Sequence, residues 1–302
     1  MNTTTKLDRR RKYYMILDCE TATLPIASKF ADENKKKRIS IAKPLIYDLG
    51  YTIIDNKGNI YIKKNFLISE IFSVPEIFNT AYYKDKRALY IDKLQKGEIE
   101  LKSWSEASQE LETDLYNVSA VGAYNSMFDY KKAIPFTDLY ISQLYSENFH
   151  SWLESQNRIC EWIAEGGKPM REEENKDFEK NIFRFRGGAF NLFDVWGLAC
   201  LHLLNCAEYK KLCIENEWAS ASGKYFTTNA EKAFRFLSGD NEFIEQHTAI
   251  DDCIIESAIF AEVVKKTKNK WEIGIIYFPF KELGTVAEFC AENEIENPFG
   301  VD

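Results

Sequence analysis

Two carboxylates, Asp18 and Glu20, stand one residue apart at the end of an apolar segment near the start of the chain. The segment Tyr13–Asp18 has the aromatic and aliphatic composition of a short buried strand. Side chains alternate along a strand, so Asp18 and Glu20 are expected to project together from its end. Two carboxylates held that close repel each other unless a cation lies between them. The pair is therefore a candidate metal site, although a solvated strand end can have the same sequence.

A third candidate acid follows another apolar segment. Ala120–Tyr124 has the composition of a strand, and Asn125–Asp129 (NSMFD) comes directly after it. An acid about one helical turn beyond a strand can return to the same end of the sheet. Asn125 is of a residue type that caps helices. A capped helix that carries a surface Asp is the alternative interpretation.

His247 stands just before Ala249–Val264, a segment with the apolar periodicity of a helix. Histidine is the side chain best suited to proton transfer near neutral pH. Asp251 and Asp252 fall in the first turn of this helix, where acids also favour the helix dipole. The apolar periodicity centres the buried face nearer Asp251 and leaves Asp252 at its edge. The residues alone therefore leave open which of the two acids joins a site.

The sequence pattern around these residues predicts an α/β protein. Strands are expected at Tyr13–Asp18, Ile46–Ile54, Ile60–Ile68, Ala120–Tyr124 and within Asn181–Phe193, with an edge strand at Gly274–Phe280. Helices are expected over residues 138–165 and at Asp194–Asn205, Ala230–Leu237 and Ala249–Val264, and an exposed loop at Gly166–Lys180. A hairpin beside a first strand, followed by helix-connected strands, predicts a mixed sheet with helices on its faces.

The composition excludes several classes of protein. The 302 residues carry 47 Asp and Glu against 39 Lys and Arg, a net charge of −8, which argues against a protein that coats nucleic acid in bulk. An enzyme with a local basic path remains compatible with this charge. Seven cysteines without a C-x-x-C pair indicate reduced thiols, and three histidines without metal-ligand spacing argue against a histidine-rich zinc site. We expect no membrane span and no secretory signal, because the longest apolar segment, Val195–Ala207, is too short and the N-terminus is polar.

Taken together, the three motifs resemble those of the DEDD superfamily of exonucleases, in its histidine-containing DEDDh branch. The D-x-E motif is Asp18 and Glu20, the N-x-x-F-D motif is Asn125 to Asp129, and the H-x-A-x-x-D motif is His247, Ala249 and Asp252. The branch includes the epsilon proofreading subunit of bacterial DNA polymerase III. Segments such as YDLGYTIIDNKGNIY are also similar to epsilon-like exonucleases of bacteriophages.

The resemblance implies a ribonuclease-H-like fold, with a five-stranded mixed sheet and the acids at one sheet end. It implies an exonuclease domain over residues 1–270, with a helical insertion at about 138–190, and a C-terminal extension over 271–302 packed on the same domain. It implies 3′→5′ hydrolysis of phosphodiesters to nucleoside 5′-monophosphates with two divalent cations, Mg²⁺ or Mn²⁺. The implied ligands are Asp18, Glu20, Asp129 and Asp252, and His247 is the implied general base. The family spacing selects Asp252 over Asp251.

The substrate implied by the resemblance is the 3′ end of single-stranded DNA, or a frayed 3′ end. Thr21, Asn125 and Phe128 are the candidate substrate-binding residues, and Lys35–Arg38 and Arg184 with Arg186 are candidates for tracking phosphates. A DNA polymerase or other replication protein is a candidate partner, and a cytoplasmic location is expected, that of the host if a phage encodes the chain. Three alternatives stay open: an exoribonuclease for short RNA, a catalytically weak module that binds nucleic acid or a polymerase, and a hydrolase of small nucleotides.

Overall fold

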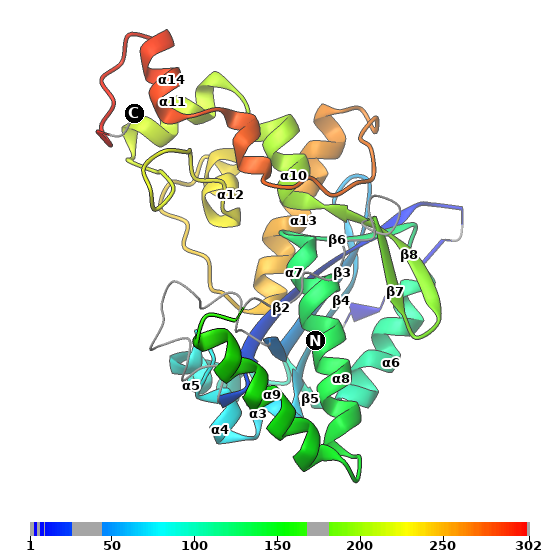
Figure 1. Ribbon diagram of the computed structural model, residues 1–302. Coiled ribbons are helices and arrows are strands. Elements are labelled where there is room, and N and C mark those ends of the chain that lie inside the picture. The colour runs from blue at the N-terminus through cyan, green and yellow to red at the C-terminus, as the bar shows by residue number, and fades with distance from the viewer. Residues whose placement is uncertain (1–2, 5–6, 9, 26–43, 168–180, 301–302) are drawn as a thin grey trace.

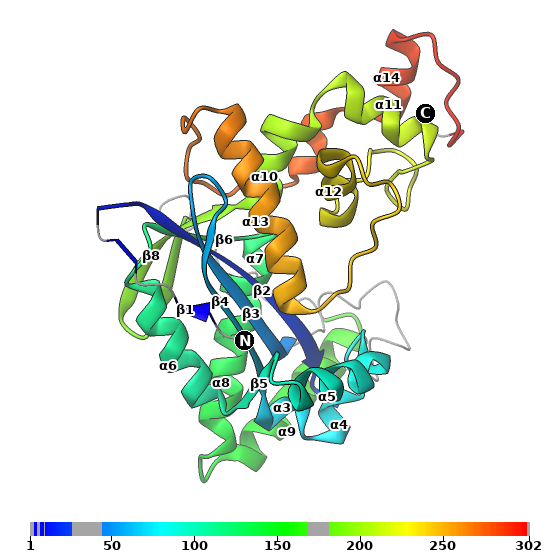
Figure 2. The same ribbon diagram turned by 180° about the vertical axis from the view of Figure 1, so that it is seen from behind.

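One mixed sheet of eight strands carries helices on both of its faces in a computed structural model that describes residues 3–4, 7–8, 10–25, 44–167 and 181–300 (Figure 1 and Figure 2). The strands are β1 (Thr3–Thr4), β2 (Tyr13–Thr23), β3 (Pro44–Asp55), β4 (Ile60–Ile68), β5 (Glu100–Lys102), β6 (Ala120–Ala123), β7 (Ile182–Phe185) and β8 (Gly188–Asp194). The prediction of an α/β protein with a mixed sheet is confirmed. The predicted count of five strands is wrong.

The centre of the sheet has the order β4-β3-β2-β6-β8. Strand β3 is antiparallel to both β2 and β4, whereas β6 is parallel to both β2 and β8. The additional strands β1, β5 and β7 are short: two, three and four residues long. Strands of two or three residues show too little alternation to be recognised in a sequence. Strand β7 was missed because it forms a hairpin with β8 inside the segment Asn181–Phe193, where one strand was predicted.

The helices cover the two faces in two groups. They are α3 (Ser69–Phe72), α4 (Pro75–Phe78), η2 (Lys84–Lys86), α5 (Arg87–Gln95), α6 (Trp104–Leu115), α7 (Ser126–Phe128), η3 (Asp129–Ala133), α8 (Ile134–Leu144), α9 (Phe149–Ala164), α10 (Val195–Ala199), η4 (Cys200–Leu204), α11 (Ala207–Glu215), α12 (Ala230–Ser238), α13 (Ala249–Lys266), η5 (Pro279–Leu283) and α14 (Val286–Glu292). Helices from α3 to α9 contribute to one hydrophobic core, and those from α10 to α14 contribute to the other.

Strand β2 separates the two cores, because its side chains alternate between them. Tyr13, Met15 and Leu17 belong to the first core, and Tyr14 and Ile16 to the second. Continuing this alternation places the next even-numbered residues of β2 on the side of the second core. That is the side on which α13 packs against the sheet.

Several predicted elements differ from the structure. The strand predicted at Tyr13–Asp18 continues to Thr23 as β2, so Asp18 and Glu20 lie within the strand and not at its end. The helical stretch 138–165 is divided between α8 and α9. The edge strand predicted at Gly274–Phe280 is wrong. Among the described residues, a single backbone–backbone hydrogen bond joins this segment to the sheet, from the Asp194 N–H to the Gly274 carbonyl at 3.3 Å. The 3₁₀ turn η5 begins at Pro279. Most of the predicted loop Gly166–Lys180 lies outside the described residues.

All seven cysteines are free thiols. In the described ranges, no helix combines the length and the apolar character needed to cross a lipid bilayer. Val286, Phe289 and Cys290 of α14 are buried in the second core, which joins the C-terminal segment to the helices of that face.

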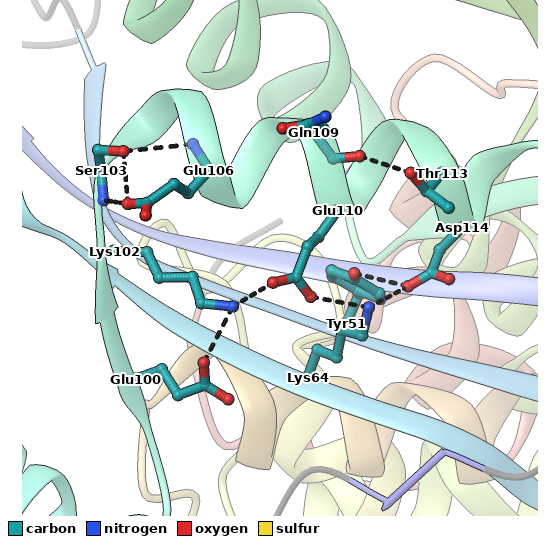
Figure 3. Close-up of polar contacts among 10 residues, drawn as sticks. All are labelled: Tyr51, Lys64, Glu100, Lys102, Ser103, Glu106, Gln109, Glu110, Thr113 and Asp114. Carbon is teal, nitrogen blue, oxygen red and sulfur yellow. Dashed lines mark hydrogen bonds and ion pairs between the residues drawn. The ribbon is translucent and has the colours of Figure 1, made fainter.

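A charged network fastens α6 to the outer strands (Figure 3). The Lys64 Nζ lies 2.9 Å from a Glu110 oxygen and 2.8 Å from Asp114 Oδ2, and the Tyr51 hydroxyl donates to the same Asp114 oxygen. Lys102 pairs with Glu110 as well. The side chains of Lys64 and Asp114 are only 14% and 9% exposed, so removal of Lys64 would leave the buried Asp114 carboxylate without its cation, while Glu110 would keep Lys102.

We therefore expect Lys64→Ala to lower the free energy of unfolding by about 2 kcal/mol. Lys96→Ala is the matched control, because its pair with Asp92 is exposed and such pairs are worth about 0.5 kcal/mol or less. Urea denaturation of both variants measures the difference. Equal stability losses would show that the network does not hold α6 in place.

Candidate active site

The C-terminal part of β2 and the start of α13 bring three acids together. One carboxylate oxygen from each of Asp18, Glu20 and Asp252 lies within 4.8 Å of the others. The pairing of β2 with β3 shifts register between Glu20 and Thr21, so a bulge follows directly after the second acid. Residues more than two hundred positions apart therefore meet at one end of the sheet.

The start of α13 is fixed on β3 by a buried acid and a glycine. The Ala249 N–H donates to Asp48 Oδ2 at 3.0 Å, and Asn65 Nδ2 donates to the other Asp48 oxygen. A Cβ atom on Gly50 would stand 2.5 Å from both Ala249 C and Ile250 N. Only a residue without a side chain lets the helix approach the strand this closely. These contacts set the depth at which the first turn of α13 sits beside β2.

The structure separates the roles of the two neighbouring acids. Asp251 Oδ2 lies 2.7 Å from Lys93 Nζ and accepts a bond from the Thr248 hydroxyl. Burial opposes ionisation of Asp251, but these bonds outweigh it and lower its pKa. Asp252 belongs to the cluster, and its Oδ1 is buried without a hydrogen-bond partner among the described residues. A buried carboxylate oxygen facing other carboxylates is the arrangement that a hard divalent cation satisfies.

Asp129 opens η3 and is almost fully buried. Burial, followed by repulsion from Asp18, raises the pKa of Asp129 well above its usual value, so the two carboxylates influence each other directly. Asp129 is in neither of the acidic groups that bring their ligand atoms within 4.8 Å of one another in the described chain. The structure therefore places it beside the cluster rather than within it.

The predicted capping role of Asn125 is wrong. Asn125 adopts a left-handed conformation, with φ of 78°, and its side chain makes no capping bond. Asp194 of β8 takes over this function: one oxygen accepts from the Ser126 N–H at 3.0 Å, and the other from the Gly197 N–H at 2.9 Å. One carboxylate thus anchors the starts of both α7 and α10.

His247 lies in a second group of candidate ligands with Glu245 and Asp252. Its Nδ1 is 3.3 Å from a Glu245 oxygen, and its ring stacks on Tyr83 with centroids 4.7 Å apart. Burial, together with the nearby charge of Lys86, lowers the pKa of His247. The imidazole is therefore neutral near pH 7 and able to accept a proton.

Three further acids of the site were missed in the sequence. Asp48 is paired with Glu20 across the β2–β3 ladder, Glu245 stands two residues before His247, and Glu256 follows Asp252 by one helical turn. Glu256 is buried and accepts a 3.1 Å bond from the Tyr124 N–H. Glu256 alone had a signal in the sequence: it stands four residues after Asp252 on an otherwise apolar face of the helix.

The candidate substrate-binding residues differ in their exposure and in their contacts. Thr21 follows the bulge in β2 and is half-buried, and Asn125 is exposed. Phe128 packs against the first core with part of its surface exposed. Arg186 bonds the Ser108 hydroxyl at 2.6 Å, which gives it a structural partner on α6. Lys35–Arg38 lie outside the described residues.

The electrostatics of the cluster favour a bound cation. Burial and repulsion from Asp48 raise the pKa of Asp18 to about 8. Burial and repulsion from Asp18 raise the pKa of Glu20 and of Asp252 to about 10. Each group therefore resists ionisation until a positive charge compensates it.

These shifts predict that the metal-free protein loses stability as the pH rises. The folded chain retains protons on these carboxyls above pH 5, where the unfolded chain has released them, so the stabilisation disappears as the pH rises toward 8 and beyond. We expect the free energy of unfolding in chelator to fall by about 1 kcal/mol or more per pH unit in this range. Excess Mg²⁺ or Mn²⁺ should reverse the loss.

Chemical denaturation between pH 6 and 9, with chelator and with each cation, measures this effect. Asp18→Asn is the control, because it removes one of the coupled charges and should flatten the pH dependence. A stability that changes with neither pH nor cation would contradict a metal site here.

Comparisons of this chain with protein-family models, with curated proteins and with solved structures found no match. The functional argument therefore rests on the sequence motifs and on the geometry described above.

Proposed function

We propose that this chain is a metal-dependent 3′→5′ exonuclease of the DEDDh type, which hydrolyses single-stranded DNA or frayed 3′ ends to nucleoside 5′-monophosphates. The observation that carries the proposal is the meeting of Asp18, Glu20 and Asp252 within 4.8 Å of one another, with His247 beside them. Two motifs from opposite ends of the chain supply these residues, and Asp129 of the third motif lies beside them. If each motif were only a helix start or a solvated strand end, nothing would bring their acids and the histidine together at one place.

A ribonuclease-H-like fold is part of this proposal. The central strands β4-β3-β2-β6-β8 form a mixed sheet that begins with an antiparallel hairpin, and the acids gather at one end of it. Residues 1–270 would form the exonuclease domain and 271–302 its extension. The burial of α14 in the second core supports an extension that packs on this domain.

The residues suit the chemistry of phosphodiester hydrolysis. Asp18, Glu20, Asp129 and Asp252 would hold two cations, Mg²⁺ or Mn²⁺, through hard oxygen ligands. When bound, such cations neutralise the phosphate, activate the attacking water and stabilise the leaving oxygen. Neutral His247 would take the proton of the attacking water. The ring of Tyr83 limits rotation of the imidazole, and Glu245 bonds its Nδ1, which leaves Nε2 to act as the base.

The proposal is tested by a gel time course on 5′-labelled single-stranded DNA and its RNA counterpart. We expect a ladder that shortens from the 3′ end with Mg²⁺ or Mn²⁺ and disappears with chelator. His247→Ala should slow the reaction by about 10²- to 10⁴-fold, the usual contribution of a general base. His150→Ala is the matched control, because this exposed histidine lies on α9.

The outcomes separate the candidate functions. Faster shortening of the RNA would assign the enzyme to short RNA instead of DNA. Binding of either oligonucleotide without shortening, in every metal condition, would replace the enzyme by a nucleic-acid-binding module. Equal rates for His247→Ala and His150→Ala would remove His247 from the mechanism.

A further inference from the structure

A cavity of about 390 Å³ lies next to the carboxylate cluster and is walled by aromatic rings. The residues that matter for its character are Tyr124, Asn125, Trp196, Phe226, Thr228 and Phe280. We call this cavity the aromatic pocket. None of the described residues that line it carries a charge, so its interior suits a neutral and flat ligand.

The rings of the aromatic pocket are held in a fixed stack. Tyr124 and Trp196 lie 6.4 Å apart with an interplanar angle of 26°, and Trp196 and Phe280 lie 6.2 Å apart at 19°. The Tyr124 hydroxyl donates to the Thr228 carbonyl, and Trp196 Nε1 donates to the Thr228 hydroxyl. Both polar ends are therefore satisfied within the protein, so the ring faces are prearranged for stacking.

A hydrogen bond connects one wall of the aromatic pocket to α13, the helix that carries Asp252. The Tyr124 N–H donates to Glu256, which lies four residues, about 6 Å along the helix axis, from Asp252. Asn125, at the rim, begins the turn that leads to Asp129. One wall of the pocket therefore lies directly beside the helix that carries Asp252.

Two lysines stand near the outer side of the aromatic pocket. The ring centroids of Tyr225 and Phe278 lie 5.0 Å and 6.1 Å from that of Phe280. The Nζ of Lys224 lies over the Tyr225 ring, and the Nζ of Lys281 lies over the Phe278 ring. Aromatic rings for bases beside lysines for phosphates are the combination by which proteins bind single strands without reading sequence.

We propose that the aromatic pocket binds an unpaired nucleobase of the strand whose 3′ end lies at the carboxylates. This inference rests on the proposed function and extends it, because it assigns a second binding position that selects an unpaired polynucleotide over a mononucleotide. The residues that follow β6, those of α10 and η5, and the segment before α12 build this position. Of the lining residues that the structure describes, Asn125 alone belongs to the three motifs.

The test measures binding of a fluorescein-labelled dT octamer to the full chain by anisotropy, in Ca²⁺. Phe280→Leu removes the ring while keeping an apolar side chain of similar size, and Tyr116→Ala removes an exposed ring elsewhere as the control. We expect Phe280→Leu to weaken binding by about tenfold and Tyr116→Ala to leave it unchanged. Octamers with one abasic position, placed in turn at each of the four nucleotides nearest the 3′ end, locate the bound base.

One abasic position should weaken wild-type binding by about tenfold, and it should have little further effect on Phe280→Leu. Equal affinity of Phe280→Leu and wild type for the intact octamer would overturn the proposal. A loss of free adenosine binding in Phe280→Leu with intact octamer binding would assign the pocket to free nucleosides, and would overturn it as well.

Failure of the pocket can be distinguished from failure of the catalytic site. Hydrolysis of the p-nitrophenyl ester of thymidine 5′-monophosphate engages the acids without a neighbouring base, so Phe280→Leu should leave this rate unchanged. If the wild-type protein binds the octamer through the pocket but cleaves neither substrate, the pocket stands and the exonuclease fails. A Phe280→Leu variant that loses ester hydrolysis to the same degree as octamer binding would contradict a separate binding role.

Discussion

Asp252→Asn is expected to abolish most of the exonuclease activity, while the neighbouring Asp251→Asn leaves it nearly intact. The structure gives the two acids different partners: Asp252 faces Asp18 and Glu20, whereas Asp251 is bonded to Lys93. An amide at position 252 is a weaker ligand for a hard cation than a carboxylate. The loss should be at least as large as that of the general base, about 10²- to 10⁴-fold.

Rates on a single-stranded DNA oligonucleotide at saturating Mg²⁺ measure this difference. Asp251→Asn weakens a partly buried ion pair and should lower stability modestly, so denaturation midpoints of both variants serve as the control for folding. If Asp251→Asn were the inactive variant and Asp252→Asn the active one, Asp251 would be the metal ligand and the proposed site would be wrong.

Gly50→Ala is expected to destabilise the protein strongly. Its Cβ would stand 2.5 Å from backbone atoms of Ala249 and Ile250, which cannot move without shifting the start of α13. We expect a loss of about 3 kcal/mol in the free energy of unfolding. Because the same turn carries Asp252, activity and cation binding should fall in the fraction that still folds.

Gly274→Ala is the matched control, since its Cβ would meet only Asn181 at 3.7 Å, an ordinary contact. Thermal unfolding of both variants, with and without Mn²⁺, gives the comparison. A Gly50→Ala protein with wild-type stability would show that α13 has room to move away from β3, and would remove the argument that this contact sets the position of Asp252.

Strands β2, β3 and β4 and helix α13 were predictable because their apolar patterns are long. Ile60–Ile68 was predicted with the bounds that β4 has, and the α13 segment was two residues short. The short outer strands gave no such signal. The predicted edge strand at Gly274–Phe280 failed because a run of apolar residues does not reveal whether a neighbouring strand has room to pair with it.

The roles of the site residues could be predicted only in part, because their contact partners lie far away in the sequence. Periodicity favoured Asp251 for the buried face, but Lys93, 158 residues away, decides its role in the structure. The cap predicted for Asn125 was supplied by Asp194 for the same reason, since the acceptor comes from a strand 68 residues further on. Local sequence shows which residues are able to do chemistry, and tertiary contacts decide which of them do.

The contact between Ala249 and Asp48 joins positions 201 residues apart, and this distance has a consequence during translation. On the ribosome, the three antiparallel strands β2, β3 and β4 emerge long before α13 has been synthesised. A nascent chain at that stage has Asp18 and Glu20 but neither His247 nor Asp252. If the chain is the nuclease that we propose, it stays inert beside the messenger RNA that encodes it, and becomes active only when the last long helix docks on the sheet.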